Sequence, residues 1–368
     1  MERYLKHQIV HDLKEKMVFL AGPRQVGKTT LAKSIEKNPQ YLNWDIDEDR
    51  SKILSKEYQK SSLWIFDEIH KYKNWRNYLK GLYDKLSSQQ KILVTGSAKL
   101  NTLRKGGDSL QGRYHFLRLM PLSCKELQLT STNDLLHLYN LSGFPEPFLN
   151  NSKVSCNRWS RSYRERIVRQ EISSNEQFLD LATIEIALNR LPDLVGGLLS
   201  INSLAEDLQV DHKTLSKWID ALERLYAVYR IAPFGSPKIK ALKKAQKIYF
   251  YDWNAIIDEG ARFENFVATH LLKWVYYEQD TQGRSLDLRY YRDKFEREVD
   301  FIITENNKPV LFIETKVSDA DSTKGLKYLK GKFPSVRSLQ IHLKGKKEYI
   351  DGNGIEHSSC LKFLNELI

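Results

Sequence analysis

The chain has 368 residues, enough for about two to four domains, and its 41% hydrophobic and 28% charged residues are typical of globular proteins. No apolar run approaches the ~18–20 residues that span a bilayer, and the N-terminus lacks the apolar core of a signal peptide, so we expect a cytoplasmic protein without membrane contact. The 58 basic residues outnumber the 46 acidic ones and give a net charge of +12, which favours a polyanionic partner, nucleic acid first, over a protein that is simply basic.

The first predicted strand, residues 17–21, leads into the sequence GPRQVGKTT, which fits the pattern G-x-x-x-x-G-K-[ST] and is followed by a helical pattern. Strand, glycine loop and helix in this order indicate a P-loop. Its backbone N–H groups cradle phosphates, Lys28 reaches the β and γ oxygens, and the Thr29 hydroxyl binds Mg²⁺. The predicted ATP-binding residues of this loop are Gly22, Pro23, Arg24, Gln25, Val26, Gly27, Lys28, Thr29 and Thr30.

A second apolar strand, residues 63–66, ends in Asp67 and Glu68. A P-loop needs a further carboxylate for its magnesium ion, and Asp67 is placed to hold that ion through water. Glu68 would then orient or polarise the attacking water. The alternative is a strand that ends in acids only for solubility.

The third predicted strand, within residues 91–99, ends in small polar residues. Ser97 or Thr95 is expected to contact the γ-phosphate, because ligands bind at the carboxyl edge of such sheets. Arg113 precedes a fourth β-like run. It is either an arginine finger, in cis or toward a neighbouring subunit, or a surface arginine.

Several of these motifs together resemble an AAA-type P-loop ATPase family of bacteria and archaea, whose members carry a C-terminal region of long-undefined function. The resemblance rests on GPRQVGKTT, WIFDE, VTGS, and QGR followed by PLS, with SGFPEPF, YRERIVRQEI and RFENFVATHL further on. It implies ATP and Mg²⁺ as cofactors. The arginines of the longer stretch RWSRSYRERIVRQEI are expected on a solvated helix, or one of them faces the nucleotide of a neighbouring subunit in a homo-oligomer or dimer. They are Arg158, Arg161, Arg164, Arg166 and Arg169.

Residues 201–231 have the pattern of a helix, a tight turn and a longer helix, with Asp211 as the N-cap of the second helix. Such a helix-turn-helix would display His212, Lys213, Ser216 and Lys217 near the start of a recognition helix. Two β-like runs follow, and the segment between them, 235–246, contains four lysines and no acid, with Lys247 just beyond. A lysine-rich wing of this kind favours contacts with DNA phosphates, although winged helices also bind proteins.

The last third begins with an amphipathic helix, residues 259–279, which carries Glu264 among apolar residues. Two strands joined by a turn follow, and alternation places Phe312, Glu314 and Lys316 on one face of a central strand. Unpaired charges buried there would cost several kcal/mol each. A metal ion shared with Asp300 of the paired strand removes that cost.

This arrangement resembles the PD-(D/E)xK nuclease fold. The resemblance implies that Asp300 and Glu314 bind Mg²⁺, or Mn²⁺ in its place, that Lys316 activates or positions the attacking water, and that Glu264 is an accessory ligand. Val299 replaces the proline of the nominal motif. The alternative is a nuclease-like fold retained for binding, with the carboxylates in a cluster of salt bridges.

We therefore expect an α/β protein of four parts. These are a P-loop ATPase domain of AAA-like parallel sheet (1–125), a helical linker or lid (126–180), a winged helix (181–253) and a PD-(D/E)xK nuclease-like domain (254–368). The expected function is Mg²⁺-dependent ATP binding and hydrolysis coupled to DNA binding or to metal-dependent DNA cleavage. The alternatives are an ATP-driven switch whose C-terminal domains only bind partners or DNA, and a nucleotide-stabilised scaffold with negligible turnover.

Overall fold

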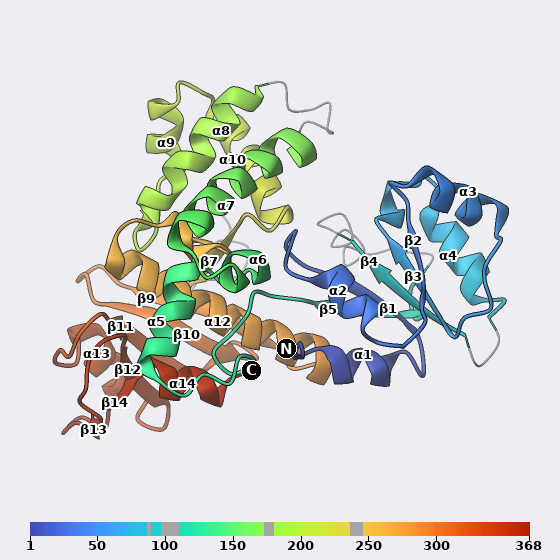
Figure 1. The fold of residues 1–368 in the computed structure, drawn as a ribbon. Helices are drawn as coiled ribbons and strands as arrows, with labels where there is room; N and C mark the ends of the chain where they lie inside the picture. The colour runs from blue at the N-terminus through green and yellow to red at the C-terminus, as the bar shows by residue number, and fades with distance from the viewer. Residues whose placement is uncertain (87–89, 97–109, 173–179, 236–245) are drawn as a thin grey trace. The chain divides into compact units, whose positions relative to one another are not determined.

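The computed structural model describes residues 1–86, 90–96, 110–172, 180–235 and 246–368 (Figure 1). The chain divides into two compact units, one formed mainly by residues 1–120 and the other by most of residues 121–368. Among the described residues, no helix combines the length and the apolar character that crossing a bilayer requires.

The N-terminal unit is built on a parallel sheet of five strands in the order β2-β3-β4-β1-β5. The strands are β1 (Met17–Ala21), β2 (Gln40–Asn43), β3 (Leu63–Asp67), β4 (Lys91–Thr95) and β5 (Tyr114–Arg118). Every residue of β1 and β3 is buried, as expected for parallel strands that are covered on both faces. The predicted parallel α/β domain is confirmed.

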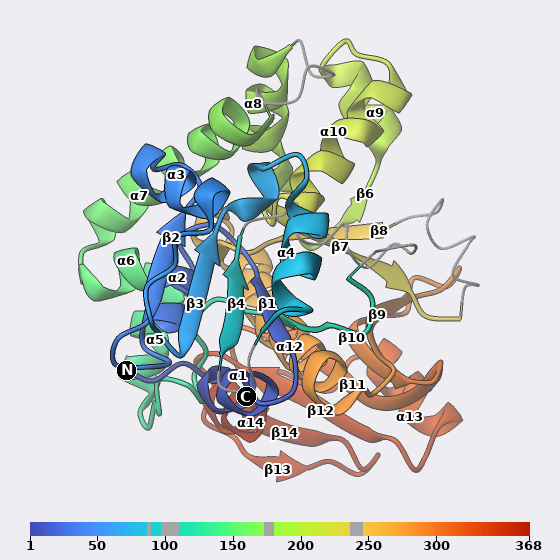
Figure 2. The ribbon, with the colours of Figure 1, turned by 90° about the vertical axis from the view of Figure 1, so that its right-hand side faces the viewer.

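Four α-helices and a short 3₁₀ helix belong to this sheet: α1 (Lys6–Asp12), α2 (Lys28–Lys33), α3 (Asp47–Ser55), α4 (Trp75–Tyr83) and η1 (Ile69–Lys71). Trp75 and Leu79 of α4 and Ile53 of α3 pack with Phe19 and Phe66 on one face, and Figure 2 shows α4 in front of the strands. On the other side, α1 contacts β1, and α2 contacts β3 and β4.

The strand register brings three functional segments to one edge of this sheet. Asp67 at the end of β3 is opposite Thr95 at the end of β4, and Thr95 is opposite Leu20 of β1. The glycine loop starts two residues after Leu20. The carboxyl ends of β1, β3 and β4 therefore meet beside the loop, where ligands bind in open α/β sheets.

The C-terminal unit starts with a helical region. Its helices are α5 (Thr132–Leu141), α6 (Pro145–Leu149), α7 (Lys153–Arg166), the π-helical η3 (Ile167–Ile172), α8 (Leu181–Arg190), η4 (Leu191–Leu194), α9 (Ile201–Asp207) and α10 (His212–Arg224). Later helices are η5 (Trp253–Ala255), α12 (Glu259–Gln282), α13 (Lys324–Lys332) and α14 (Cys360–Glu366).

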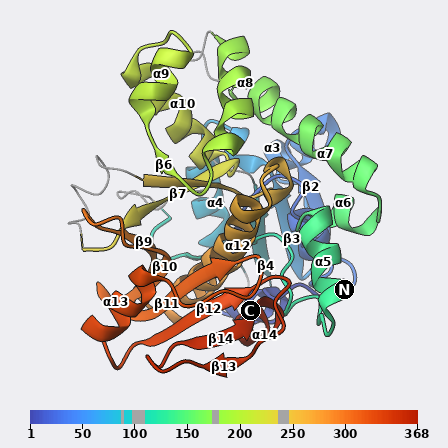
Figure 3. The ribbon, with the colours of Figure 1, turned by 90° about the vertical axis from the view of Figure 1, so that its left-hand side faces the viewer.

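One sheet runs through most of this unit, with the order β13-β14-β12-β11-β10-β9-β7-β8-β6 (Figure 3). Its strands are β6 (Leu198–Leu199), β7 (Val228–Pro233), β8 (Gln246–Phe250), β9 (Leu286–Arg292), β10 (Glu298–Glu305), β11 (Lys308–Lys316), β12 (Arg337–His342), β13 (Tyr349–Ile350) and β14 (Glu356–Ser359). The parallel pairing of β7 with β9 joins the region predicted as a winged helix to the region predicted as nuclease-like.

The hairpin of β10 and β11 lies at the centre of this sheet. Leu326 and Leu329 of α13 pack on Ile302 and Phe312 of the two strands. The pairing of β10 with β9 shifts register between Val299 and Ile302, which is a β-bulge at Asp300. Bulges of this kind re-aim a side chain next to a site.

Candidate functional site

The glycine loop has the backbone that a P-loop sequence demands. Gly22 and Gly27 have φ values of 144° and 96°, which favour glycine, and Gln25 also has a positive φ of 59°. A Cβ on Gly22 would lie 2.2 Å from the carbonyl oxygen of Leu119, so the loop start is packed too closely for any side chain. Lys28 is buried, and its ammonium donates to the carbonyls of Gly22 and Pro23 at 3.0 and 2.6 Å.

Asp67 is the hydrogen-bonding centre of this site. The Thr29 hydroxyl donates to its Oδ2 at 3.0 Å, and the Tyr41 hydroxyl donates to the same oxygen at 2.6 Å. Thr95 donates to Oδ1 at 2.7 Å. The structure thus brings the predicted Mg²⁺ residues Thr29 and Asp67 together. Thr95, one of the two residues considered for contact with the γ-phosphate, points at the carboxylate.

Glu68 follows in a left-handed backbone conformation, with a φ of 56°. Burial, and then the charge of Asp67, raises the pKa of the Glu68 carboxyl. Its Oε2 forms no hydrogen bond within the described part of the chain, and His70 Nε2 and Lys71 Nζ lie 3.4 and 3.7 Å away. A carboxylate with an uncommitted oxygen next to Asp67 can accept a hydrogen bond from a water molecule.

The donors of this site fit a magnesium ion. The Thr29 hydroxyl and the Asp67 carboxylate are hard oxygen ligands, and their oxygens lie 3.0 Å apart. Thr29 and Asp67 would hold the ion, with Tyr41 and Thr95 fixing the orientation of the carboxylate.

Arg113 lies at the other end of the sheet. It precedes Tyr114, which is opposite Met17 at the amino end of β1, whereas the P-loop follows the carboxyl end. Its guanidinium pairs with Asp84 at 2.9 Å. This placement is incompatible with an arginine finger in cis, because strand length separates Arg113 from the loop. A role toward a neighbouring subunit stays a prediction, and Ser97 lies outside the described residues.

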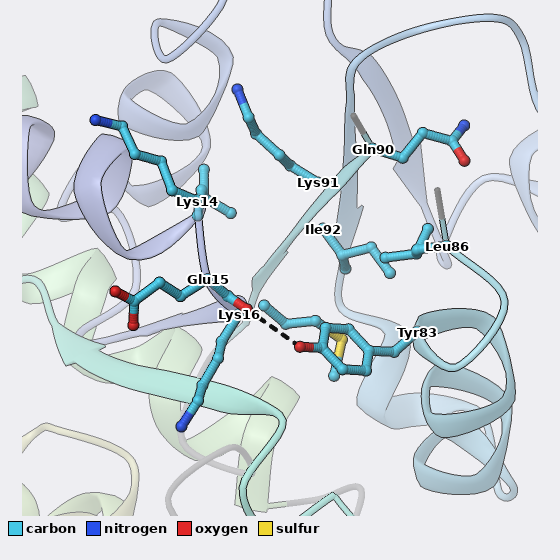
Figure 4. Close-up of a pocket in the computed structure, with 10 residues that line it drawn as sticks. Lys14, Glu15, Lys16, Tyr83, Leu86, Gln90, Lys91 and Ile92 are labelled. Carbon is cyan, nitrogen blue, oxygen red and sulfur yellow. Dashed lines mark hydrogen bonds between the residues drawn. The ribbon is translucent and has the colours of Figure 1, made fainter. Parts of the chain in front are cut away.

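A cavity of about 270 Å³ also lies at this amino-terminal edge (Figure 4). Lys14, Lys16 and Lys91 surround it, and the Tyr83 hydroxyl donates to the carbonyl of Glu15 at 3.2 Å. Because it adjoins the first residues of β1 and β4, it is separate from the nucleotide loop.

In the C-terminal unit, α10 begins as expected for a capped helix. Asp211 Oδ2 accepts hydrogen bonds from the backbone N–H groups of Lys213 and Thr214, at 2.8 and 3.2 Å. His212, Lys213 and Lys217 are exposed, and Ser216 is half-buried. The lysine-rich stretch 236–245 lies outside the described residues, and Lys247, which follows it, is buried.

The four residues predicted for the second site lie close together around β10, β11 and α12. Asp300 Oδ2 accepts from the N–H and the hydroxyl of Thr315, at 2.8 and 2.6 Å. Lys316 donates to Glu314 Oε1 at 2.8 Å, and the Asp300 N–H donates to Glu314 Oε2 at 3.3 Å. Glu264 is linked to Asp300 through an unexpected residue, Lys247.

Burial dominates the electrostatics of this second cluster. Burial, followed by the charge of Asp300, raises the pKa of Glu264 to about 7 and that of Glu314 to about 8. Burial alone would lower the pKa of Lys247, but the surrounding carboxylates outweigh it and raise that pKa. The same competition, with Glu314 as the partner, raises the pKa of Lys316.

The cluster as arranged does not fit a metal ion. Among the described residues, no three acidic, histidine or cysteine side chains are placed to hold one together. One oxygen each of Asp300, Glu314 and Glu264 already accepts a hydrogen bond, from Thr315, Lys316 and Lys247 respectively.

Sequence reasoning missed residues that reach these sites from other strands. Tyr41 of β2 contacts Asp67, and Tyr249 of β8 donates to Glu264 Oε1 at 2.7 Å. Glu298 pairs with Lys247 at 2.5 Å. The available signal was a lysine at the start of the run KIYFY, beside residues typical of a buried strand, where an unpaired charge is disfavoured.

Comparison with known proteins agrees with the first site. Residues 14–128 match the family model described as AAA domain, and residues 132–254 and 259–359 each match a domain of unknown function (DUF8612 and DUF4143).

Three similar proteins add context. An uncharacterized protein of Mycobacterium tuberculosis is 25% identical over 297 residues, covering 74% of this chain and 67% of its own length. One of Methanocaldococcus jannaschii is 26% identical over 328 residues, covering 70% and 68%. The solved Walker-type ATPase of Pyrococcus abyssi is 14% identical and covers 67% of this chain and 92% of its own, with a TM-score of 0.43.

The match to the AAA domain agrees with the glycine loop, the parallel sheet and the Asp67–Glu68 pair of the N-terminal unit. Such a domain binds a nucleotide, usually with Mg²⁺. Residues 14–128 therefore match the AAA domain and have the parallel sheet and glycine loop of a P-loop ATPase.

Proposed function

We propose that this protein is a Mg²⁺-dependent ATPase that acts as a nucleotide-controlled switch on DNA and does not cut it. The observation that carries the ATPase is the arrangement around Asp67, whose Oδ2 lies 3.0 Å from the Thr29 hydroxyl with Glu68 next in the chain. These are the oxygen donors and the carboxylate that phosphoryl transfer requires.

The residues divide the work of hydrolysis between them. The loop N–H groups and Lys28 bind and orient the phosphates, and the ion held by Thr29 and Asp67 would neutralise charge that develops on them. Glu68 accepts a hydrogen bond from the attacking water and aligns it with the γ-phosphorus. Burial favours this role, because it leaves the carboxylate with few competing partners.

Glu68→Gln tests the assignment. The amide keeps the shape of the side chain but loses the negative charge that polarises the attacking water, so we expect phosphate release to fall by about 10²–10⁴-fold while ATP binding persists. Phosphate release is measured with a coupled assay and ATP binding with a fluorescent analogue. Lys28→Ala is the matched comparison, because it should lose binding as well. Wild type without turnover, with or without DNA, would favour the nucleotide-stabilised scaffold instead.

DNA is proposed as the partner from the charge and from the order of elements in the C-terminal unit. The net charge is +12, and α9, α10 and the paired β7 and β8 follow one another as in a winged helix. The exposed Lys213 and Lys217 at the start of α10 suit contacts to phosphates, which carry affinity without reading sequence.

Charge reversal tests the DNA surface. We expect Lys213→Glu/Lys217→Glu to weaken binding of a fluorescent duplex and to reduce the slope of log affinity against log salt by about two, one for each lost contact. Lys56→Glu/Lys60→Glu changes the charge equally at two exposed lysines of the N-terminal unit and serves as the control. Equal losses in both variants would show a non-specific effect of net charge, and no loss in either would remove α10 from the interface.

A further inference from the structure

Lys247 is a lysine in the interior of the C-terminal unit. It lies on β8, only 1% of its side chain is exposed, and its ammonium contacts carboxylates from two other elements. Its Nζ lies 2.9 Å from Glu264 Oε1, 2.5 Å from Glu298 Oε1 and 4.0 Å from Asp300 Oδ1. A buried ammonium surrounded in this way is held by charge, since burial alone would disfavour it.

The three carboxylates around Lys247 would otherwise repel one another. Glu264 comes from α12, and Glu298 and Asp300 come from β10, where the bulge turns the strand. Like charges that share a site cannot all ionise unless a cation lies among them. In many proteins that cation is a divalent metal bound by oxygen. Here the chain places its own ammonium at that point.

Three other oxygens of the cluster accept hydrogen bonds from groups other than Lys247. Thr315 holds Asp300 Oδ2 through its N–H and its hydroxyl. Lys316 holds one oxygen of Glu314, and the N–H of Asp300 holds the other. A metal ion entering between Asp300 and Glu264 would meet the ammonium of Lys247, and two cations in one buried site repel strongly.

We infer that Lys247 is the built-in cation of this carboxylate cluster and replaces the divalent metal, so that the C-terminal unit binds its partner without binding Mg²⁺ or Mn²⁺ and without cleaving phosphodiesters. The inference goes beyond the ATPase and does not depend on it. The predicted nuclease-like site is then an internal ion-pair network, in which Lys247 of β8 holds α12 and β10 through their carboxylates.

Removing the lysine should create the metal site. We use the full chain with Thr29→Ala/Asp67→Ala, which removes the P-loop metal ligands, and measure Mn²⁺ binding by electron paramagnetic resonance without nucleotide. With Lys247 intact, we expect no Mn²⁺ binding that depends on Asp300. Lys247→Met keeps the length and the apolar stem but removes the charge, so it should bind Mn²⁺, and Asp300→Asn should abolish that binding.

Two further arms make the outcome decisive. Lys316→Met removes a lysine of the same cluster but keeps Lys247, and it should bind no Mn²⁺; binding equal to that of Lys247→Met would overturn the role of Lys247. Mn²⁺ should raise the melting temperature of Lys247→Met but not that of the parent. If Lys247→Met fails to fold, the parent alone decides, because Mn²⁺ binding by the parent that Asp300→Asn removes would also overturn the inference. The P-loop is disabled throughout, so failure here is separate from failure of the ATPase.

Discussion

Asp67 shows how much one residue of this protein depends on partners that are distant in sequence. Its Oδ2 accepts from Thr29 of the P-loop and from Tyr41 of the edge strand β2, and its Oδ1 accepts from Thr95 of β4. Hydrogen bonds from neighbouring side chains, such as those of Tyr41 and Thr95, orient a carboxylate toward the metal ion that it binds. Lys33 lies 3.7 Å over the ring of Tyr41, which fixes the tyrosine in turn.

Tyr41→Phe should therefore raise the Mg²⁺ requirement of the ATPase. The change removes only the hydroxyl that donates to Asp67 at 2.6 Å, and loss of an orienting partner costs about 10–100-fold in metal affinity or activity. The measurement is the ATPase rate against Mg²⁺ concentration. Tyr58→Phe is the control, because that hydroxyl donates to the Ile53 carbonyl at 3.5 Å and is not bonded to Asp67 in the described part of the chain. An unchanged Mg²⁺ dependence in Tyr41→Phe would contradict the role given to Tyr41.

At the scale of elements, the sequence predicted those features that local backbone geometry imposes. The P-loop could be identified because Gly22 and Gly27 have φ values of 144° and 96°, which favour glycine. The spacing of these two glycines places Lys28 and Thr29 directly after the loop. Alternation correctly placed Glu314 in a buried central strand, and β11 lies between β10 and β12.

Contacts between distant strands could not be predicted in this way. Arg113 was considered as an arginine finger because the sequence pattern does not show which edge of the sheet a residue occupies. In the structure, Arg113 lies beside Met17 at the amino edge. The carboxylate partners of Lys247 were not predicted, because alternation gives the face of a strand but not its neighbours. Lys247 lies on β8, which pairs with β7. The pairing of β7 with β9 then brings β8 into the same sheet as Asp300.

The close packing of the P-loop against the segment after β5 gives a prediction for an element. Gly22→Ala would place a Cβ 2.2 Å from the Leu119 carbonyl oxygen, at a φ of 144°, so the loop must shift. Overpacking costs about 1–3 kcal/mol, and we expect lower stability and at least a tenfold loss of ATP affinity. Urea unfolding and nucleotide titration measure the two effects.

Gly81→Ala is the matched control for Gly22→Ala. It lies on the exposed side of α4, where a Cβ would meet nothing within 4 Å. Alanine is favoured over glycine inside a helix by about 0.5–1 kcal/mol, so this variant should be slightly more stable and bind ATP normally. Gly22→Ala with wild-type affinity would show that the loop tolerates the shift and that its close packing is not needed for nucleotide binding.

At the scale of the whole molecule, a nucleotide switch is a statement about coupled equilibria. If ATP changes the affinity for DNA by some factor, DNA must change the affinity for ATP by the same factor, because the two routes to the ternary complex have equal free energy. Couplings of this kind are typically about 5–150-fold. Glu68→Gln, with its expected slow hydrolysis, allows both affinities to be measured at equilibrium.

We therefore expect the DNA affinity of Glu68→Gln to differ with and without Mg²⁺-ATP by at least about fivefold, and its ATP affinity to differ with and without DNA by the same factor. Anisotropy of a labelled duplex gives the first, and titration with a fluorescent ATP analogue gives the second, both at one fixed salt concentration because DNA affinity depends on salt. Lys28→Ala should lose the effect of ATP on DNA binding while keeping the affinity of the nucleotide-free protein. A factor of one in both titrations would mean that the ATPase does not control DNA binding, and unequal factors would mean that hydrolysis, not binding, drives the change.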